Sequence, residues 1–509
     1  MEEAPSSRLQ AAGLVVGPAL FALILLAEPP AGMSPGAHRT AALACWMACW
    51  WLTVAVPLEA TALLPLVALP LFGGVVEGRG AAGIERAAAP YANSVIFLFL
   101  GGFFLAAAME RWGLHRRVAY AILATVGTDA TRVVLAFMLA TAFISMWISN
   151  TATAVMMMPM ATAVIGLART SRVESQESRE ATRQPLPTLD SQLLTPDGLG
   201  PALVLGVAYA ASIGGMATLI GTPPNTIFAG AVRQLEHQDF GFGRWMRTGV
   251  LLVLVLLPAC WLLLTRLFPT RGLVAGLAAR LREERAALGP LRGGERWTLV
   301  VFLLAVAAWL LREPKELGGF TIPGITRWAP GVSDAGIAIG AALLLFAVPV
   351  SLRAWRFALD WPTARRAPWG MLLVFGGGLS LAEAFQTSGL SSWIGGLLSG
   401  LEGLSTAVVA LGVAVVFIAL SELASNTAVA AMGMPLLASI APAVGQPPIQ
   451  LMQVAALAAS ISFLLPISTP PNAVAFATGE VTVPQMVKAG IGMDIISVLA
   501  ITAAAVWLM

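Results

Sequence analysis

The tripeptide Ser-Asn-Thr occurs twice in this sequence, at residues 149–151 and 425–427, and each copy lies inside a long apolar stretch. The two surrounding segments, WISNTATAVMMMPM and LASNTAVAAMGMPL, share SNTA and a Met-Pro pair at the same spacing. Hydrocarbon offers no hydrogen bonds, so a polar triplet at membrane depth needs buried partners or a functional role. The duplication therefore predicts a chain that is organised around two related polar points.

The composition places the chain among polytopic membrane proteins. Of its 509 residues, 58% are hydrophobic and 11% are charged, and the mean hydropathy is +0.81. The apolar runs are long enough to span a membrane as helices, and they lack the alternation of a barrel strand. The net charge of +3 does not favour a nucleic-acid partner. The three cysteines, Cys45, Cys49 and Cys260, have no metal-ligand spacing and are interpreted as packing residues.

An all-α polytopic membrane fold is expected, with about eleven transmembrane helices and two re-entrant helix hairpins. The segment 131–167 is too long for one helix and too short for two full spans, and its SNT triplet lies near the middle. This pattern predicts a helix hairpin whose tip lies inside the protein. The second SNT triplet predicts a matching hairpin at 404–441. The other spans are expected at roughly 12–28, 41–56, 58–76, 94–110, 248–268, 297–311, 335–350 and 486–509, and after Trp369.

Two further apolar segments, 199–232 and 450–483, each contain Thr-Pro-Pro-Asn, at residues 222–225 and 469–472. Paired prolines remove backbone donors and free nearby carbonyls, so each helix is expected to unwind there. Unwound points of this kind commonly coordinate ions in transporters.

The motifs recur at constant offsets, which indicates an internal repeat. Residues 101–114 align with residues 377–390 at an offset of 276, and the SNT triplets share that offset. The two Thr-Pro-Pro-Asn motifs lie 247 residues apart. This offset is shorter than 276 because a polar insert follows only the first hairpin. An odd number of spans separates the two copies, which predicts inverted orientation. The expected units are scaffold helices at 1–93 and 297–368, repeats that form a transport domain at 94–268 and 369–509, and a basic linker at 269–296.

Residues 266–296 carry seven arginines against three glutamates. By the positive-inside rule this connection is cytoplasmic. We expect a multi-pass protein of the inner or plasma membrane with a cytoplasmic N-terminus.

The two hairpin tips and the two helix breaks are four non-helical segments that can meet at one site near the middle of the membrane. This arrangement predicts an alternating-access transporter. Neither hairpin core and neither Thr-Pro-Pro-Asn neighbourhood contains Lys, Arg or His. Neutral oxygens suit Na⁺, whereas Asn and Thr donors with helix N-termini suit an anion. Bound cations could supply the positive charge that the side chains lack.

The paired SNT and Thr-Pro-Pro-Asn motifs, with WWLT followed by PLEATALLPLVALP, resemble the divalent anion/sodium symporter family of di- and tricarboxylate transporters. Val54 departs from the pattern, since relatives often carry Glu there. The resemblance implies a homodimeric, Na⁺-coupled symporter of C4-dicarboxylates such as succinate, malate or fumarate, which works by an elevator motion. The alternatives are a Na⁺-independent dicarboxylate exchanger and a carrier of citrate or sulfate.

The resemblance also implies roles for individual residues. The first Na⁺ site would use Ser145, Ser149, Asn150 and the carbonyl of Gly221. Its mate would use Ser421, the carbonyl of Ala424, Asn426 and Ser468. Substrate would meet Asn150, Thr151, Thr222, Ser425, Asn426, Thr427, Thr469 and Pro470.

Competing interpretations remain for several of these residues. Ser and Thr in membrane helices often bond only the preceding turn, although duplication at a constant offset favours a site. Glu422, next to the second tip, is interpreted as bonding the backbone of its own hairpin rather than contacting substrate or carrying a proton. A channel would need a continuous polar path, and an enzyme would need a nucleophile, base or metal near a tip. The three histidines, His38, His115 and His237, lie elsewhere.

Overall fold

The computed structural model describes residues 8–72, 81–181, 198–270, 272–274, 276–317, 320–397 and 403–509. Within them, eight helices are long and apolar enough to cross a membrane, and five shorter apolar helices accompany them. The described part is therefore largely helical, as the composition predicts. Its strands are confined to two small hairpins in the connections.

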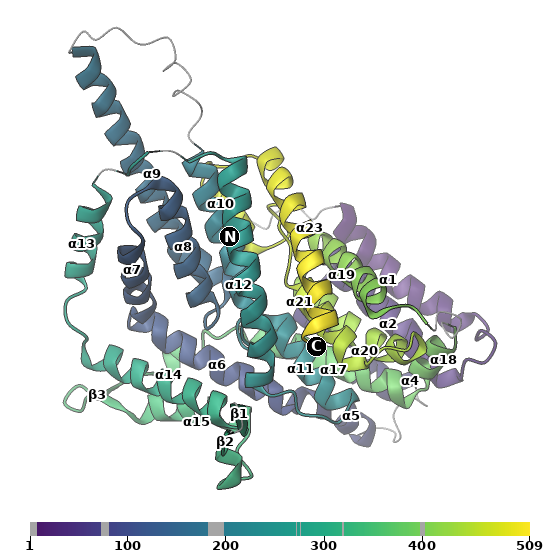
Figure 1. Cartoon of the computed structure of the whole chain (residues 1–509). Helices are drawn as coiled ribbons and strands as arrows, with labels where there is room; N and C mark the ends of the chain where they lie inside the picture. The colour runs from purple at the N-terminus through teal and green to yellow at the C-terminus, as the bar shows by residue number, and fades with distance from the viewer. Residues whose placement is uncertain are drawn as a thin grey trace.

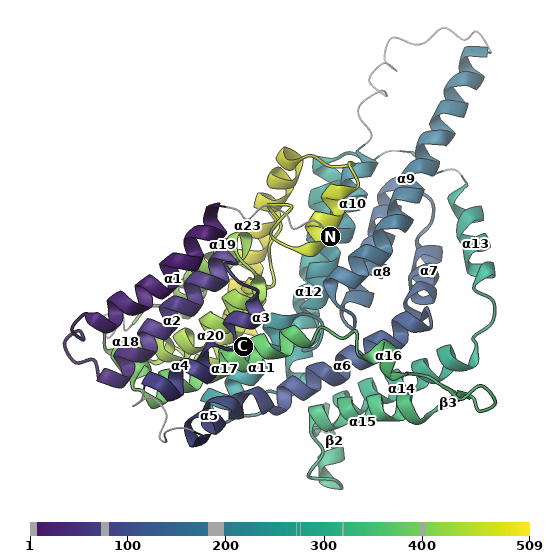
Figure 2. The same cartoon turned by 180° about the vertical axis from the view of Figure 1, so that it is seen from behind.

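The N-terminal helices form a group at one side of the molecule (Figures 1 and 2). Helix α1 packs along α2, and a turn follows in which Val54 adopts a left-handed φ of 49°. Helix α2 ends at Thr53 and a new helix begins at Leu58, so a turn separates the spans expected at 41–56 and 58–76. The group comprises α1 (Arg8–Leu26), α2 (Pro35–Thr53), α3 (Leu58–Thr61), α4 (Leu64–Phe72), α5 (Ala81–Ala88) and the 3₁₀ helix η1 (Ala89–Ala92).

The first repeat contains a helix pair and a helix that is interrupted by a non-helical segment. Its elements are α6 (Ser94–Arg111), α7 (Leu114–Val126), α8 (Ala130–Ser145), α9 (Asn150–Ala181), α10 (Leu199–Gly215), α11 (Pro223–Leu235) and α12 (Phe242–Leu267). The first polar tip is the four-residue gap between α8 and α9, and the first break is the gap between α10 and α11.

The middle of the chain carries the two small hairpins. Its elements are α13 (Leu277–Ala287), α14 (Gly293–Leu311), β1 (Lys315–Leu317), β2 (Phe320–Ile322), η3 (Ile325–Arg327), α15 (Asp334–Ala347), β3 (Pro349–Ser351), β4 (Arg356–Phe357) and α16 (Trp361–Ala364). Strands β1 and β2 pair antiparallel with Lys315 opposite Ile322, and β3 pairs antiparallel with β4. The predicted basic linker contains a helix, α13, which propensity allows because residues 277–287 are rich in Ala, Leu, Arg and Glu.

The second repeat has the same order of elements. It contains α17 (Trp369–Thr387), α18 (Leu390–Leu397), α19 (Thr406–Leu423), α20 (Asn426–Ala443), α21 (Pro448–Ala459), α22 (Pro470–Ala477) and α23 (Val483–Trp507). Helices α18, α19 and α20 begin 276 residues after α7, α8 and α9, and α22 begins 247 residues after α11. The offsets found in the motifs are thus also the offsets of the helix starts.

Two predicted boundaries need correction. The first hairpin was expected to end at residue 167, but α9 continues to Ala181 and projects beyond its neighbours in Figure 1, since no Gly or Pro interrupts residues 167–181. The helices were expected to unwind at the Thr-Pro-Pro-Asn motifs, but the non-helical residues, 216–222 and 460–469, precede the prolines. Proline occupies the first helical position of α11 and α22, where a missing N–H costs no helical hydrogen bond.

The two repeats brace each other. Helix α22 of the second repeat packs on α9 and α10, and α11 of the first repeat packs on α20 and α21. Each broken helix therefore contacts the helix pair of the other copy. This exchange brings all four polar gaps into one packed body.

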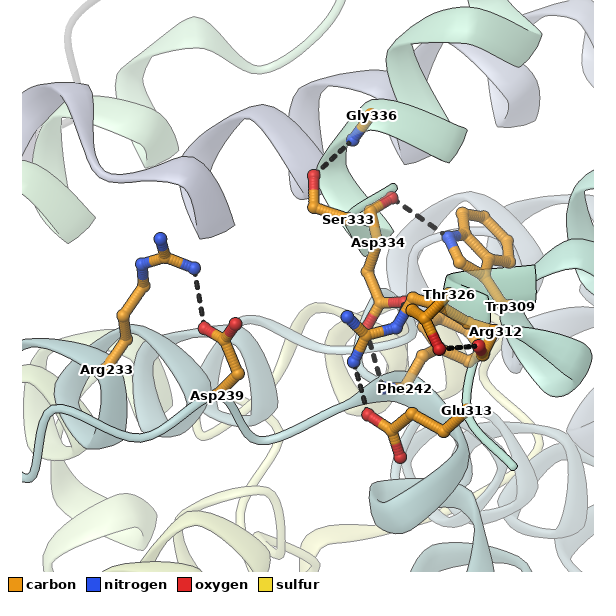
Figure 3. Close-up of polar contacts among 10 residues, drawn as sticks. All are labelled: Arg233, Asp239, Phe242, Trp309, Arg312, Glu313, Thr326, Ser333, Asp334 and Gly336. Atoms are coloured by element: carbon orange, nitrogen blue, oxygen red, sulfur yellow. Dashed lines mark hydrogen bonds and ion pairs between the residues drawn. The ribbon is translucent and has the colours of Figure 1, made fainter. Parts of the chain in front are cut away.

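A polar cluster joins α14 and α15 to the start of α12 (Figure 3). The Asp334 carboxylate accepts a 2.8 Å hydrogen bond from the Phe242 amide and lies 2.8 Å from Nε of Arg312. A Cβ on Gly241 would lie 2.4 Å from Glu313 Oε1, so the backbone approaches this cluster closely. Glycine before α12 permits this approach.

Aromatic rings extend the same junction to the first polar tip. Trp147, in the gap between α8 and α9, meets the ring of Phe302 on α14 edge-on, with centroids 5.0 Å apart. Phe242 stacks on Trp309 of α14 with centroids 4.5 Å apart. These contacts and the polar cluster are called the contact zone below.

Candidate functional site: two matched polar breaks

Three oxygens gather where the first tip meets α10. The Ser145 hydroxyl lies 2.8 Å from Oδ1 of Asn150 and 2.7 Å from the carbonyl oxygen of Ala211. A hydroxyl has one proton, so it can donate to only one of these two acceptors. Two arrangements relieve the remaining oxygen–oxygen contact: a bound cation, or an Asn150 amide turned so that Nδ2 faces Ser145.

Glycines allow the first break to press against this oxygen group. A Cβ on Gly215 would lie 2.4 Å from Asn150 Oδ1, and a Cβ on Gly221 would lie 2.4 Å from the Gly215 carbonyl oxygen. Gly221 therefore packs on the backbone of Gly215, and Gly215 packs on the Asn150 amide. Of the four predicted ligands of the first ion site, Ser145 and Asn150 are in contact, and Gly221 packs on Gly215, which lies against the Asn150 amide.

Asn225 of the Thr-Pro-Pro-Asn motif holds the first break in shape. Its Nδ2 donates to the carbonyls of Gly215 (3.0 Å) and Thr218 (2.7 Å), which the end of α10 leaves free. The residue is fully buried, and its Oδ1 has no hydrogen-bond partner. Buried polar atoms normally have partners, so this oxygen is a further acceptor beside the break.

The second repeat has a comparable oxygen group around Asn426, but its hydroxyl comes from Ser462 in the break, and Ser421, the counterpart of Ser145, supplies the carbonyl and donates its own hydroxyl to the Ala459 carbonyl (3.3 Å). Ser462 Oγ lies 3.1 Å from Oδ1 of Asn426 and 3.0 Å from the carbonyl oxygen of Ser421. Again one hydroxyl proton faces two acceptors. Ser462 stands 247 residues after Gly215, so a side chain replaces a bare backbone at the corresponding position.

Asn472 holds the second break by the same contacts. Its Nδ2 donates to the carbonyls of Ser462 and Leu465, both at 3.1 Å, and these residues correspond to Gly215 and Thr218 at the offset of 247. Its Oδ1 is also buried without a partner. Ser468, a predicted ion ligand, lies 3.4 Å from Asn472 Nδ2. The repeat thus extends from the motifs to individual hydrogen bonds.

Glu422 breaks the symmetry between the two halves. Its carboxylate accepts hydrogen bonds from the backbone amides of Phe463 (2.5 Å) and Leu464 (3.1 Å) in the second break. Met146 stands at the corresponding position of the first tip, where its carbonyl accepts a 2.5 Å hydrogen bond from Thr218. Glu422 does bond backbone, but the backbone belongs to the break and not to its own helix pair.

The predicted site residues differ in how far they are exposed to solvent. Ser149, Thr151 and Pro470 are exposed, and Asn150, Ser425, Asn426 and Ser468 are half-buried. Ser145, Gly221, Thr222, Ser421, Ala424, Thr427 and Thr469 are buried. Thr222 and Thr469 precede α11 and α22 with extended backbone, and Thr469 Oγ1 accepts from Asn472 N (3.3 Å).

The donor set of each group fits Na⁺. Both groups consist of neutral oxygens from a hydroxyl, an amide and a carbonyl, and in each group two acceptor oxygens face the one hydroxyl proton. Four helices, α9, α11, α20 and α22, begin at the gaps, and helix N-termini favour anions. The arrangement can therefore hold cations in the breaks and an anion between them.

Sequence reasoning did not select four residues that make these contacts: Ala211, Asn225, Ser462 and Asn472. The two asparagines were visible in the duplicated motif. Applying the offset of 247 to residues before the motif would have located Ser462. No sequence signal marks the carbonyl of Ala211, because any residue supplies one.

Solved structures resemble this fold. The YdaH transporter of Alcanivorax borkumensis aligns with a TM-score of 0.55 at 14% identity, covering 91% of this chain and 97% of that one. MtrF of Neisseria gonorrhoeae aligns with a TM-score of 0.56 at 14% identity, covering 90% and 96%. Identity this low supports the shared fold alone.

Residues 9–509 match the family described as the sodium:sulfate symporter transmembrane region. The chain belongs to the divalent anion/sodium symporter family. The sodium-dependent dicarboxylate transporter SdcS of Staphylococcus saprophyticus is 38% identical over 495 residues, which cover 97% of this chain and 90% of that protein. SdcS of Staphylococcus aureus strain NCTC 8325 is 37% identical over 502 residues, which cover 98% and 91%. This member of the family is accordingly a multi-pass membrane transporter and not an enzyme.

Proposed function

We propose that this transporter is a Na⁺-coupled symporter of C4-dicarboxylates such as succinate, malate and fumarate. The observation that carries the proposal is the pair of matched oxygen groups, each with two acceptors facing a single hydroxyl proton. The names of the SdcS relatives agree with it.

The first Na⁺ would be held by Ser145, Ser149, Asn150 and the Gly221 carbonyl, with the Ala211 carbonyl added from the contacts described above. The second would be held by Ser421, Asn426, Ser468 and the Ala424 carbonyl, with Ser462 added. The substrate would lie between Asn150, Thr151 and Thr222 on one side and Ser425, Asn426, Thr427, Thr469 and Pro470 on the other.

Coupling follows from charge. The proposed site residues are neutral, so a dianion would enter the buried space without a charge partner from the side chains. Bringing unpaired charge into low dielectric is costly. Na⁺ in the two breaks would offset this charge, and Asn150 and Asn426 would touch both ion and substrate. Ion and substrate binding would therefore favour each other.

Movement would follow the elevator scheme. The two helix pairs would be re-entrant hairpins of inverted orientation within about eleven transmembrane helices. Residues 94–268 and 369–509 would contain the moving parts, 1–93 and 297–368 the scaffold, and 269–296 a cytoplasmic linker. The protein would be a homodimer in the plasma membrane with a cytoplasmic N-terminus.

Uptake and counterflow in proteoliposomes test the function. Radiolabelled succinate should accumulate when an inward Na⁺ gradient is applied and should not accumulate when choline replaces Na⁺. Unlabelled malate or fumarate should compete with succinate for uptake. Exchange without Na⁺ would instead establish the exchanger, and preference for citrate or sulfate would establish the alternative substrates. The mass of the protein in detergent, corrected for bound detergent, tests the dimer.

A further inference from the structure

Asp494 is an acidic residue within a membrane-spanning helix, α23. Its Oδ1 is buried and has no hydrogen-bond partner, and no Lys, Arg or His forms an ion pair with it among the described residues. An ionised carboxylate without a partner at this depth is costly, so intramembrane acids indicate a functional site and a partner for the charge.

A second unpartnered group lies on the same face of α23. Ser497 follows Asp494 by three residues, which places the two side chains on neighbouring turns of one face. Ser497 is fully buried, and its Oγ has no hydrogen-bond partner. Carboxylate and hydroxyl oxygens together form an acceptor set that a hard cation would satisfy.

The same face packs against the second break. A Cβ on Gly490, one turn before Asp494, would lie 2.7 Å from the Leu464 Cα and from the Phe463 carbonyl carbon. Phe463 and Leu464 are the residues whose amides bind Glu422. Asp494 therefore lies beside the ion-binding break of the second repeat, on an element that contributes none of the proposed ion ligands.

The groups that face this region do not supply a positive charge. The Glu422 carboxylate on α19 repels the Asp494 carboxylate. Cys260 lies buried on α12, which packs along α23. Tyr209 of α10 donates its hydroxyl to the Phe463 carbonyl (2.8 Å). Lys488, on α23 itself, is exposed. The helix α21, which also packs on α23, has no charged residue.

We infer that Asp494 and Ser497 bind an additional Na⁺ beside the second break, separate from the two proposed sites. This inference rests on the proposed function, because it adds one coupling ion to the same transport cycle. The ion would neutralise the one acid that α23 carries into the protein interior.

The first test measures the ratio of Na⁺ to substrate. Fluxes of ²²Na⁺ and labelled succinate are compared in proteoliposomes for wild type, Asp494→Asn and Thr502→Val. Thr502 is a matched control, since its Oγ1 is also unpartnered on α23 but lies two turns away. We expect one Na⁺ fewer per succinate in Asp494→Asn and the wild-type ratio in Thr502→Val. An unchanged ratio in Asp494→Asn, with or without a changed pH dependence, overturns the inference.

The second test needs no substrate, so it separates this inference from the proposed function. The melting temperature of purified protein is measured in NaCl and in choline chloride, because a bound ion stabilises the folded state. In an Asn150→Ala/Asn426→Ala background, Na⁺ should still raise the melting temperature. Adding Asp494→Asn or Ser497→Ala should remove that shift. A shift that survives Asp494→Asn, or one absent from the background although the protein elutes as a single species, contradicts the extra site.

Discussion

At the scale of single residues, the duplicated motifs contain asparagines of two kinds. Asn150 and Asn426 turn their amide oxygens toward a hydroxyl that also faces a carbonyl. Asn225 and Asn472 instead use their amide nitrogens to bind carbonyls across a helix break. The first pair suits ligand binding, and the second pair maintains local structure.

Replacing Asn150 or Asn426 by Ala should abolish Na⁺-dependent uptake without unfolding the protein. Each amide is proposed to serve an ion and a substrate carboxylate, and losing two charge-assisted contacts of about 1.5–3 kcal/mol each reduces binding by a factor of about 100 or more. Initial uptake rates and the melting temperature are measured together. Normal uptake in either variant would refute the site assignment.

Asn472→Ala should behave differently from Asn426→Ala. It removes the donor to the buried Ser462 carbonyl and the half-buried Leu465 carbonyl, and a buried group left without a partner costs about 1–3 kcal/mol. The melting temperature in detergent should fall clearly even without Na⁺. If Asn472→Ala kept the wild-type melting temperature and lost only transport, Asn472 would be a ligand and not a structural residue.

The neutrality of the proposed site also predicts a pH dependence. Because its donors do not titrate, the transported species should be the dianion. Lowering pH through the carboxyl pKa values of succinate, about 4 to about 6, protonates the substrate, so uptake at fixed total succinate and saturating Na⁺ should fall. Initial rates between pH 7.5 and pH 5 measure this. A rate that rises steadily with acidity would indicate proton coupling instead.

At the scale of elements, the two helix breaks are stabilised by different groups. The first break approaches its helix pair through glycine backbone, with Thr218 bonded to the Met146 carbonyl. The second break is bound by the Glu422 carboxylate. The tip of α19 therefore carries a charge that the tip of α8 does not.

Glu422→Gln should lower stability more than it changes coupling. The amide keeps one acceptor oxygen in place of two, and charge-assisted hydrogen bonds contribute about 1.5–3 kcal/mol each. We expect a lower melting temperature in detergent, with the pH profile and Na⁺ dependence of the remaining uptake retained. A pH profile altered at unchanged stability would show that Glu422 carries a proton.

At the scale of the whole molecule, the contact zone joins the first polar tip to helices of the proposed scaffold. It combines the Trp147–Phe302 contact with the hydrogen bond from Phe242 to Asp334. A rigid-body elevator motion changes such neighbours between its end states. The zone is therefore a place where one state can be trapped.

Linking Trp147→Cys to Phe302→Cys should stop transport. The ring centroids are 5.0 Å apart, so a short, reducible thiol-to-thiol crosslinker is used after the native cysteines are replaced by Ala. Uptake should be lost on crosslinking and restored on reduction.

Gly293→Cys with Val350→Cys is the control pair. It joins the first residue of α14 to β3, which follows α15, and a Cβ on Gly293 would lie 3.6 Å from Val350 Cγ1. Crosslinking this pair should leave transport intact, because it joins the start of α14 to the strand that follows α15, and both helices belong to the proposed scaffold. Full crosslinking of the first pair with a normal uptake rate would favour local gating at the tips over an elevator.

The sequence by itself determined the membrane class, the internal repeat, the polar tips beside Asn150 and Asn426, and the presence of a break near each Thr-Pro-Pro-Asn motif. These follow from local causes: apolar length, the missing N–H of proline, and a duplication that preserves spacing. The sequence did not predict that α9 continues past residue 167 or that each break precedes its Thr-Pro-Pro-Asn motif. Helix propensity continued α9 beyond the apolar segment, and proline is tolerated in a first helical turn.

Only the tertiary structure decided which atoms surround each polar tip. Ser145 meets the Ala211 carbonyl 66 residues away, and Ser462 meets the Ser421 carbonyl 41 residues away. Such partners depend on how α8 packs on α10 and how the α19 end meets the second break, and many sequences share the same apolar pattern. Asp494 was likewise one acid in an apolar run until folding placed Gly490 against Leu464 and left the carboxylate without a partner.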